Sequence, residues 1–246
     1  MTRRCGPGGK EEGVMDEKVV GIMGGMGPEA TVDLFRKILT ATPAKTDQEH
    51  LHILIDCNSK IPSRPAALLE GGSDPTPLLQ STARNLERAG ADFLLVACNT
   101  AHLFYDRIVE AVRIPVLHIV DEAINEAQRR YPELQSVGVL AGRGAIRLRL
   151  YQDRLEAKGI KPIVPSNEDQ EIVVSVIHSV KAGDKGPAVR AKIREVAERL
   201  ARAGAQAVFT GCTELPLVLE DGDVGIPVLD PTQVLAEAAV RFARGR

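Results

Sequence analysis

The sequence predicts an α/β protein made of two similar Rossmann-like halves with mainly parallel sheets, related by a pseudo-twofold axis. Three landmarks appear twice in the same order. They are a glycine-bearing apolar run at residues 19–25 and 137–142, an apolar run ending in cysteine at 91–98 and 205–212, and an Ile-Pro-Val-Leu segment at 114–117 and 226–229. Chance rarely repeats three landmarks in one order, so we interpret the chain as an internal duplication.

Short runs rich in Val, Ile and Leu predict strands, and the stretches between them have helical character. We expect strands at residues 18–23, 51–56, 92–97, 114–118, 136–141, 160–164, 206–210 and 226–229. The expected helices include residues 29–42, 75–89, 103–112, 146–158, 187–203 and 232–243. Asp74 before Pro75 and Asp230 before Pro231 predict aspartate caps with proline opening the helix. Helices between strands favour right-handed crossovers and parallel sheets.

The duplication also predicts the domain layout. A chain of 246 residues is long enough for two domains of ordinary size. Residues 1–17 contain no apolar core, so we expect a disordered tail and not a secretory signal. Residues 18–117 together with 222–246 should form the first α/β domain, and residues 118–221 the second. Ligands of parallel sheets bind beyond the carboxyl ends of the strands, so the active site should lie in a cleft between the halves.

Composition limits the possible partners. A net charge of −2 and the absence of Trp offer neither an electrostatic field nor stacking platforms for nucleic acid. No stretch approaches the roughly 18 to 20 apolar residues of a membrane-spanning helix. The four cysteines, Cys5, Cys57, Cys98 and Cys212, form no paired motif, which indicates free thiols in a reducing cytoplasm. We therefore expect a cytoplasmic protein with no nucleic-acid or membrane partner.

Cys98 and Cys212 carry the strongest chemical signal. Each ends a buried apolar run and is followed at once by hydroxyl, amide or carboxylate residues. Inverting a stereocentre beside a carboxylate requires removal of a proton on one face and delivery on the other, and two thiols suit this because their ordinary pKa of about 8.5 needs little lowering. A free cysteine is commonly a small buried hydrophobe. Cys57 lacks a counterpart in the second half, so we expect it to be structural or incidental, and we expect the same of Cys5 in the tail.

Three motifs together resemble the cofactor-independent aspartate/glutamate racemase family, within it the aspartate racemase branch. They are Gly24-Gly-Met-Gly-Pro-Glu-Ala-Thr31, Ala97-Cys-Asn-Thr-Ala-His102 and Gly211-Cys-Thr-Glu-Leu215, and the resemblance extends from about Lys18 to the carboxyl terminus. It implies an isomerase that needs neither metal nor pyridoxal phosphate and acts at Cα of a small amino acid, with aspartate or glutamate favoured. A homodimer is implied in the same way.

The resemblance also assigns roles to individual residues. Cys98 and Cys212 match the family's two catalytic acid/bases. The positions that match substrate-binding residues are Met26 in the glycine-rich loop, Asn99 and Thr100 after the first cysteine, Thr213 after the second, Arg64, which matches an arginine that receives an acidic side chain, and Lys181, which matches a lysine near the substrate. On sequence alone, Arg64 and Lys181 fit solvated surface charges equally well.

Other polar residues near the motifs keep more than one interpretation. Glu214 fits a helper of the base, a partner of the substrate amine or a helix-entry carboxylate. His102 fits a hydrogen-bonding residue at a helix start better than a base. His118 and Asp230 occupy equivalent positions, where they would either orient a thiol or cap a strand end. The loop at Gly24 lacks the spacing of a nucleotide-binding motif, so we expect its backbone N–H groups to face a carboxylate.

The chain departs from the family pattern at residues 141–151. A threonine-rich turn and a following serine are replaced by a segment that carries Arg143, Arg147 and Arg149. That turn should face the cleft, so an arginine there would alter how substrate is held. Two rival functions remain: a thiol-dependent isomerase or decarboxylase of the same fold, and a carboxylate-binding module without catalysis.

Overall fold

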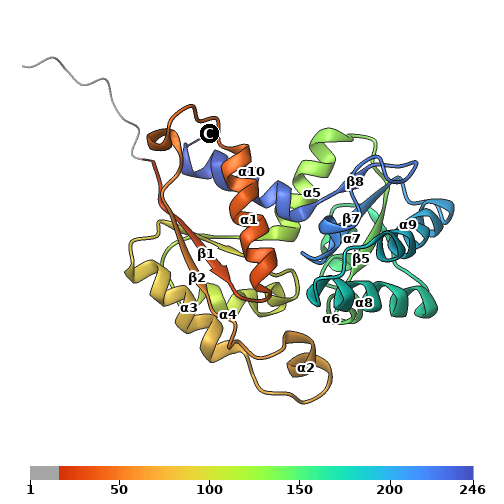
Figure 1. Cartoon of the computed structure of the whole chain (residues 1–246), viewed down its shortest axis with the longest axis horizontal. Helices are drawn as coiled ribbons and strands as arrows, with labels where there is room; N and C mark the ends of the chain where they lie inside the picture. Colours follow the sequence, from red (N-terminus) through yellow and green to blue (C-terminus); the bar gives the residue numbers. More distant parts are fainter. Residues whose placement is uncertain (1–16, 246) are drawn as a thin grey trace, which may run out of the picture.

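The computed structural model describes residues 17–245, and the predicted tail up to residue 16, with Cys5, lies outside the described residues. Its core is a pair of four-stranded parallel sheets (Figure 1). The first has the order β2-β1-β3-β4, and the second has the order β6-β5-β7-β8. The same strand order in both sheets confirms the predicted α/β fold of two similar halves.

The eight predicted strands are all present, with ends shifted by a few residues. The first sheet contains β1 (Val20–Gly24), β2 (Ile53–Cys57), β3 (Phe93–Val96) and β4 (Val116–Leu117). The second contains β5 (Ser136–Ala141), β6 (Lys161–Ile163), β7 (Ala207–Gly211) and β8 (Val228–Leu229). Strands β3 and β7 are buried along their whole length, as expected for central strands covered on both faces. Their carboxyl ends therefore present the two cysteines from rigid positions.

Helices and short 3-10 turns connect the strands. The first part of the chain contains α1 (Pro28–Ala41), η1 (Asp47–Glu49), α2 (Arg64–Leu69), α3 (Thr76–Arg88), η2 (Thr100–Phe104) and α4 (Tyr105–Val109). The remainder contains α5 (Ile119–Arg130), α6 (Arg143–Arg147), α7 (Gln152–Ala157), α8 (Asn167–Lys181), α9 (Pro187–Arg202), η3 (Leu215–Leu217) and α10 (Pro231–Ala243). Helices α2, α5 and α8 are additional to those predicted from the sequence.

Two predicted helices are interrupted. The segment expected at residues 146–158 divides into α6 and α7 because Arg149 adopts a left-handed conformation with φ of 55°, which a right-handed helix cannot contain. The segment expected at residues 103–112 begins as the 3-10 turn η2 and continues as the short helix α4. The prediction of Asp230 as a cap is confirmed, since its carboxylate accepts the N–H of Thr232 at 2.8 Å.

The two halves share a hydrophobic core. Helix α10 packs against both α1 and α5 (Figure 1). One buried cluster contains Ile22 and Phe93 from the first sheet, Val139 and Phe209 from the second, and Leu235 from α10. The assignment of residues 222–246 to the first domain and of 118–221 to the second stays a prediction. The shared core holds the sheets in a fixed relation, and hence the cleft between their strand ends.

No helix within residues 17–245 combines the length and the apolar character needed to cross a bilayer.

Candidate active site

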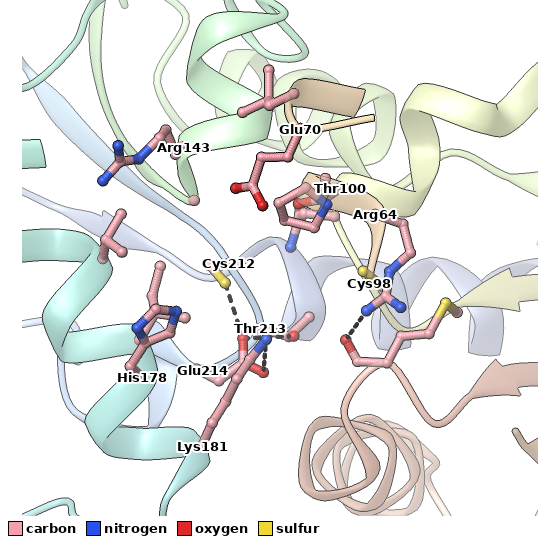
Figure 2. Close-up of a pocket in the computed structure, with 17 residues that line it drawn as sticks. Arg64, Glu70, Cys98, Thr100, Arg143, His178, Lys181, Cys212, Thr213 and Glu214 are labelled. Atoms are coloured by element: carbon pink, nitrogen blue, oxygen red, sulfur yellow. Dashed lines mark hydrogen bonds and ion pairs between the residues drawn. The ribbon is translucent and has the colours of Figure 1, made fainter. Parts of the chain in front are cut away.

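The two cysteines of the duplicated motifs line one cleft of about 320 Å³. Cys98 lies just after β3. Its N–H donates to the carbonyl of Val96 at 2.8 Å, and this hydrogen bond closes a tight turn at the end of the strand. Cys212 follows β7, and its carbonyl accepts the N–H of Leu215 at 2.9 Å, which begins η3. Figure 2 shows the two sulfur atoms at separate positions along the cleft, each presented by the end of a central strand.

The cleft gathers all the residues predicted to be catalytic or substrate-binding. Cys98 and Cys212 are joined there by Met26, Arg64, Asn99, Thr100, Lys181, Thr213 and Glu214. Sequence reasoning missed Pro65, Leu69, Glu70, Gly142, Val174, Ile177 and His178, and it mentioned Arg143 only as a departure from the family pattern. Most of the missed residues belong to α2 and α8, the helices it did not predict. Residues from both halves thus contribute to the lining; their roles stay predictions.

Cys212 lies in a polar environment. Its thiol donates a hydrogen bond to Oε2 of Glu214 at 2.9 Å, and Lys181 Nζ lies 3.6 Å from Oε1 of the same carboxylate. Burial raises the pKa of the Cys212 thiol well above its usual value, the negative charge of Glu214 raises it further, and Lys181 opposes both. At neutral pH the thiol is therefore protonated in the free protein.

Lys181 remains a cation in this arrangement. Burial by itself lowers its pKa, but the negative charge of Glu214, followed by the two cysteines, outweighs burial, so the pKa is raised. Lys181 closes α8, whose first turn is capped by the Ser166 hydroxyl. The predicted substrate-facing lysine is thus paired with Glu214 at the edge of the cleft, where the Lys181 side chain is 46% exposed and the Glu214 side chain is buried.

Cys98 is buried, with 6% of its surface exposed, and His102 is hydrogen-bonded to its backbone. His102 Nδ1 donates to the carbonyl of Cys98 at 2.9 Å, while its Nε2 accepts the N–H of Ile119 at 3.2 Å. Burial lowers the pKa of His102 to about 4, so the ring is neutral and fits these two roles. His102 is a structural hydrogen-bonding residue that ties the first cysteine loop to α5, as the sequence favoured.

His118 and Asp230 both act as helix caps. His118 Nδ1 accepts the N–H of Val120 at 3.3 Å at the start of α5, in the same way that Asp230 caps α10. Burial, followed by the neighbouring His102, lowers the pKa of His118 to about 2. Neither His118 nor Asp230 lines the cleft, so capping, and not orientation of a thiol, is the interpretation that the structure supports.

Arg64 fastens the first glycine-rich loop to the cleft wall. It is the first residue of α2 and is 8% exposed. Its guanidinium donates to the carbonyls of Ile61 at 3.2 Å, Pro62 at 2.8 Å and Met26 at 3.1 Å, and its buried Nε has no protein partner. Arg64 is therefore not a solvated charge, and part of its hydrogen-bonding capacity remains open at the cleft.

The departure from the family pattern at residues 141–151 has a clear place in the structure. Gly142 and Arg143 line the cleft, while Arg147 and Arg149 do not. Arg143 is held by Glu171, whose carboxylate oxygens lie 2.8 and 2.7 Å from Nη2. The predicted position facing the cleft is confirmed, but the charge of Arg143 is already paired.

Glu70 is a carboxylate that the motifs did not indicate. It follows α2 as its capping residue, and Figure 2 shows its carboxylate directed into the cleft. Among the described residues it forms no ion pair, in contrast to Glu214. The cleft therefore holds one engaged and one unengaged carboxylate.

Asn99 is nearly fully buried beside Cys98, with 2% of its surface exposed. Its Oδ1 accepts a hydrogen bond of 2.5 Å from the hydroxyl of Tyr151, and its Nδ2 has no protein partner. The threonine-rich turn and the serine of the family pattern are absent from residues 141–151, yet Tyr151 in that segment supplies a hydroxyl to the site.

Within residues 17–245, no group of three His, Cys, Asp or Glu side chains is arranged to hold a metal ion. Cys57, Cys98 and Cys212 are free thiols. The lining of the cleft presents both cationic and anionic side chains.

The cleft lies beyond the strand ends of two duplicated parallel α/β units, and each unit contributes one cysteine to it. The profile of the Asp/Glu/Hydantoin racemase family matches residues 23–239. The chain belongs to this family.

Individual relatives agree with this assignment. The broad specificity amino-acid racemase RacX of Bacillus subtilis is 28% identical over 235 residues, which cover 90% of this chain and 96% of the relative. The solved structure of Picrophilus torridus aspartate racemase superposes with a TM-score of 0.82 at 30% identity, covering 92% of this chain and 94% of that one. An aspartate racemase homologue from Pyrococcus horikoshii gives a TM-score of 0.75 at 27% identity, with coverage of 92% and 99%. These relatives support an amino-acid racemase, which is an isomerase.

Proposed function

We propose that the protein racemises a free amino acid without a cofactor, with Cys98 and Cys212 as opposed acid and base at Cα. The observation that carries the proposal is the meeting of two equivalent cysteines, one from each half, in a single cleft. A two-base reaction needs two groups of similar acidity on opposite sides of one carbon. A binding module has no need for a second thiol in the matching position.

In the proposed reaction one sulfur atom accepts a proton and the other donates one. The thiolate of one cysteine removes the Cα proton, the electron pair passes into the neighbouring carboxylate, and the thiol of the other cysteine protonates the opposite face. In the free protein the raised pKa of Cys212 keeps this thiol protonated, so Cys212 is the acid in the direction that begins with proton removal by Cys98. Turnover exchanges the two protonation states, and the reverse direction uses the same groups in opposite roles.

The developing carbanion places extra negative charge on the substrate carboxylate. Hydrogen-bond donors fixed in advance stabilise such charge most effectively, because they need no reorganisation during the reaction. We assign this task to the unpartnered Nδ2 of Asn99 and to the hydroxyls of Thr100 and Thr213, all of which line the cleft. The loop at Met26, held by Arg64, contributes a wall of the same cavity.

The substrate we favour is aspartate or glutamate. Arg143 is paired with Glu171 and Lys181 with Glu214, whereas Arg64 lines the cleft without an ion pair among the described residues and its buried Nε has no protein partner, so this guanidinium can receive an acidic side chain. Glu214 is already engaged by Cys212 and Lys181. We therefore assign the substrate ammonium to Glu70, the carboxylate without an ion pair among the described residues.

Solvent exchange tests the reaction directly. Purified protein is incubated in D₂O with each enantiomer of aspartate, glutamate and a set of neutral and basic amino acids, and NMR follows deuterium at Cα while chiral chromatography follows the enantiomers. A racemase incorporates deuterium at Cα and forms both enantiomers without added cofactor. Formation of carbon dioxide would instead identify a decarboxylase, and no exchange with any amino acid would refute the proposal.

Two variants serve as controls. Cys57→Ser removes an exposed thiol at the end of β2 that lies outside the cleft, and it should exchange like the parent protein. The double variant Cys98→Ser/Cys212→Ser should not exchange. Exchange retained by the double variant would show that another group performs the chemistry.

A further inference from the structure

Tyr151 connects the two cysteine loops although it lies outside the cleft lining. It lies between α6 and α7 in the sequence, in the second half of the chain, and its side chain is fully buried. Its hydroxyl reaches Asn99 across 52 positions of sequence. Its ring lies beside Gly211, the residue before Cys212, so closely that a Cβ on Gly211 would fall 2.8 Å from Cε2. One side chain thus contacts the neighbour of each cysteine.

The hydrogen bond from Tyr151 determines what Asn99 offers to a ligand. An amide side chain has an acceptor end and a donor end, and the Tyr151 hydroxyl occupies the acceptor end at 2.5 Å. The donor end, Nδ2, is left buried without a protein partner. Because burial of an unpaired donor costs free energy, this atom is expected to find its partner in a bound molecule, and the adjoining cavity is the cleft that Asn99 lines.

The hydroxyl keeps its proton under all ordinary conditions. Burial, followed by the charges of Asp230 and Cys212, raises the pKa of Tyr151 well above its usual value. A hydroxyl that cannot ionise remains a donor, and Asn99 Oδ1 is the acceptor within reach. The ring is held by its contact with Phe209, at 5.9 Å between centroids, so the hydroxyl has a fixed direction.

We propose that Tyr151 is a positioning residue that locks the Asn99 amide with its NH₂ group toward the substrate carboxylate. The second half of the chain thereby controls a substrate-binding group that belongs to the first. This inference rests on the proposed racemase function, and it adds a residue that touches no substrate. Gly211 fits the same arrangement, because any larger residue there would push the Tyr151 ring away from its place.

A double-mutant cycle tests the proposal. Tyr151→Phe removes the hydroxyl and keeps the ring, so its packing against Gly211 is preserved. We expect kcat/KM to fall about 10-fold, with a lower kcat as well as a higher KM, because the Nδ2 donor both binds the substrate carboxylate and stabilises the charge that develops on it; this fold-change corresponds to one lost interaction of ordinary strength. In an Asn99→Ala background, Tyr151→Phe should change kcat/KM by less than about twofold, since the group it orients is gone.

A matched control separates positioning from general stability. Tyr105→Phe removes another hydroxyl hydrogen bond, 2.7 Å to the carbonyl of Val116, at a site outside the cleft lining. Its kcat/KM should equal that of the parent protein even where its melting temperature falls. A purely structural role for Tyr151 would lower kcat/KM equally in both backgrounds, and this result would overturn the proposal.

The orientation of the amide is tested by Asn99→Asp. This variant keeps an acceptor for Tyr151 but replaces the donor with a second carboxylate oxygen, so binding of a carboxylate substrate should be lost. Unchanged KM in Asn99→Asp would show that the substrate meets an acceptor, which contradicts the proposed orientation. Failure of the parent protein to exchange deuterium would refute the racemase function instead, so the two failures are distinguishable.

Discussion

The two cysteine loops occupy matching places in the two halves, but their surroundings differ. Cys98 is buried, and its loop is held by a neutral histidine that binds the backbone. Cys212 has a carboxylate as the direct acceptor of its thiol and an ammonium group beyond it. The duplication has preserved where each strand delivers its sulfur, while the residues after each strand have diverged. Backbone placement and thiol acidity are therefore separate properties of this site.

The largest expected effect comes from replacing either thiol alone. Cys98→Ser and Cys212→Ser should each lower racemisation by about 10² to 10⁴-fold, the usual contribution of one general acid or base. The loss should be one-sided: each variant loses proton removal from the enantiomer whose Cα proton faces the missing thiol. Chiral chromatography combined with deuterium exchange from each enantiomer measures this. Equal, unimpaired turnover in either variant would contradict the two-thiol mechanism.

Gly21 in β1 and Gly138 in β5 occupy equivalent positions, so substituting each tests whether the two halves are equally tightly packed there. A Cβ on Gly21 would lie 2.6 Å from Leu94 Cδ2 and 2.9 Å from Ala91 Cβ, whereas on Gly138 the closest atoms are 3.2 Å away. Gly21→Ala should cost about 1–3 kcal/mol of unfolding free energy through overpacking. Gly138→Ala should cost less, because the nearest atoms are 3.2 Å from its Cβ and the added methyl group causes less overpacking. Urea unfolding measures both, and equal losses would contradict the comparison.

The two carboxylates of the cleft also differ in their surroundings: Glu214 is bonded to Cys212 and Lys181, whereas Glu70 has no ion pair among the described residues. Glu70→Gln should raise KM for every amino acid substrate by about 10-fold, since a hydrogen bond to a charged group contributes about 1.5–3 kcal/mol and the ammonium is common to all substrates. Glu133→Gln, at an exposed site outside the cleft, is the matched control. An effect confined to substrates with cationic side chains would instead assign Glu70 to the side chain.

The smallest expected effects concern the acidity of Cys212. Glu214→Gln removes a negative charge that raises the pKa of this thiol, so the pKa should fall and thiolate should form at lower pH. Lys181→Gln removes the opposing positive charge, so the pKa should rise and thiolate should form only at higher pH. Thiolate absorbance against pH, recorded in a Cys5→Ser/Cys57→Ser/Cys98→Ser background, measures both shifts. Shifts of the same sign would refute this account.

Much of this arrangement follows from local sequence. Apolar runs predict all eight strands, and Asp230 before proline predicts a helix cap because both signals act within a few residues. The strand ends then locate Cys98 and Cys212, since ligands of parallel sheets bind at that edge. Helices α2 and α8 were missed, and with them most of the lining residues that the motifs did not indicate.

The contacts that complete the site depend on packing between distant segments. The hydrogen bond from Tyr151 to Asn99 joins positions 52 apart, and it exists only because the two halves pack together. Glu70 follows a short helix that carries no motif. Arg149 interrupts a segment whose composition favours a continuous helix. Neither periodicity nor spacing reports such contacts, because they are decided by tertiary structure.

The shared core also determines how a substrate enters. Ile22, Phe93, Val139 and Phe209 lie in one buried cluster with residues of α10, so a hinge motion separating the halves would expose this cluster to water at a large cost in free energy. Entry is less costly through the rim, where α2 contributes Arg64 and Pro65 and contacts the short helix α6. No residue of α2 belongs to a buried hydrophobic cluster, so we expect substrate to reach the cleft past this helix while the two sheets stay together.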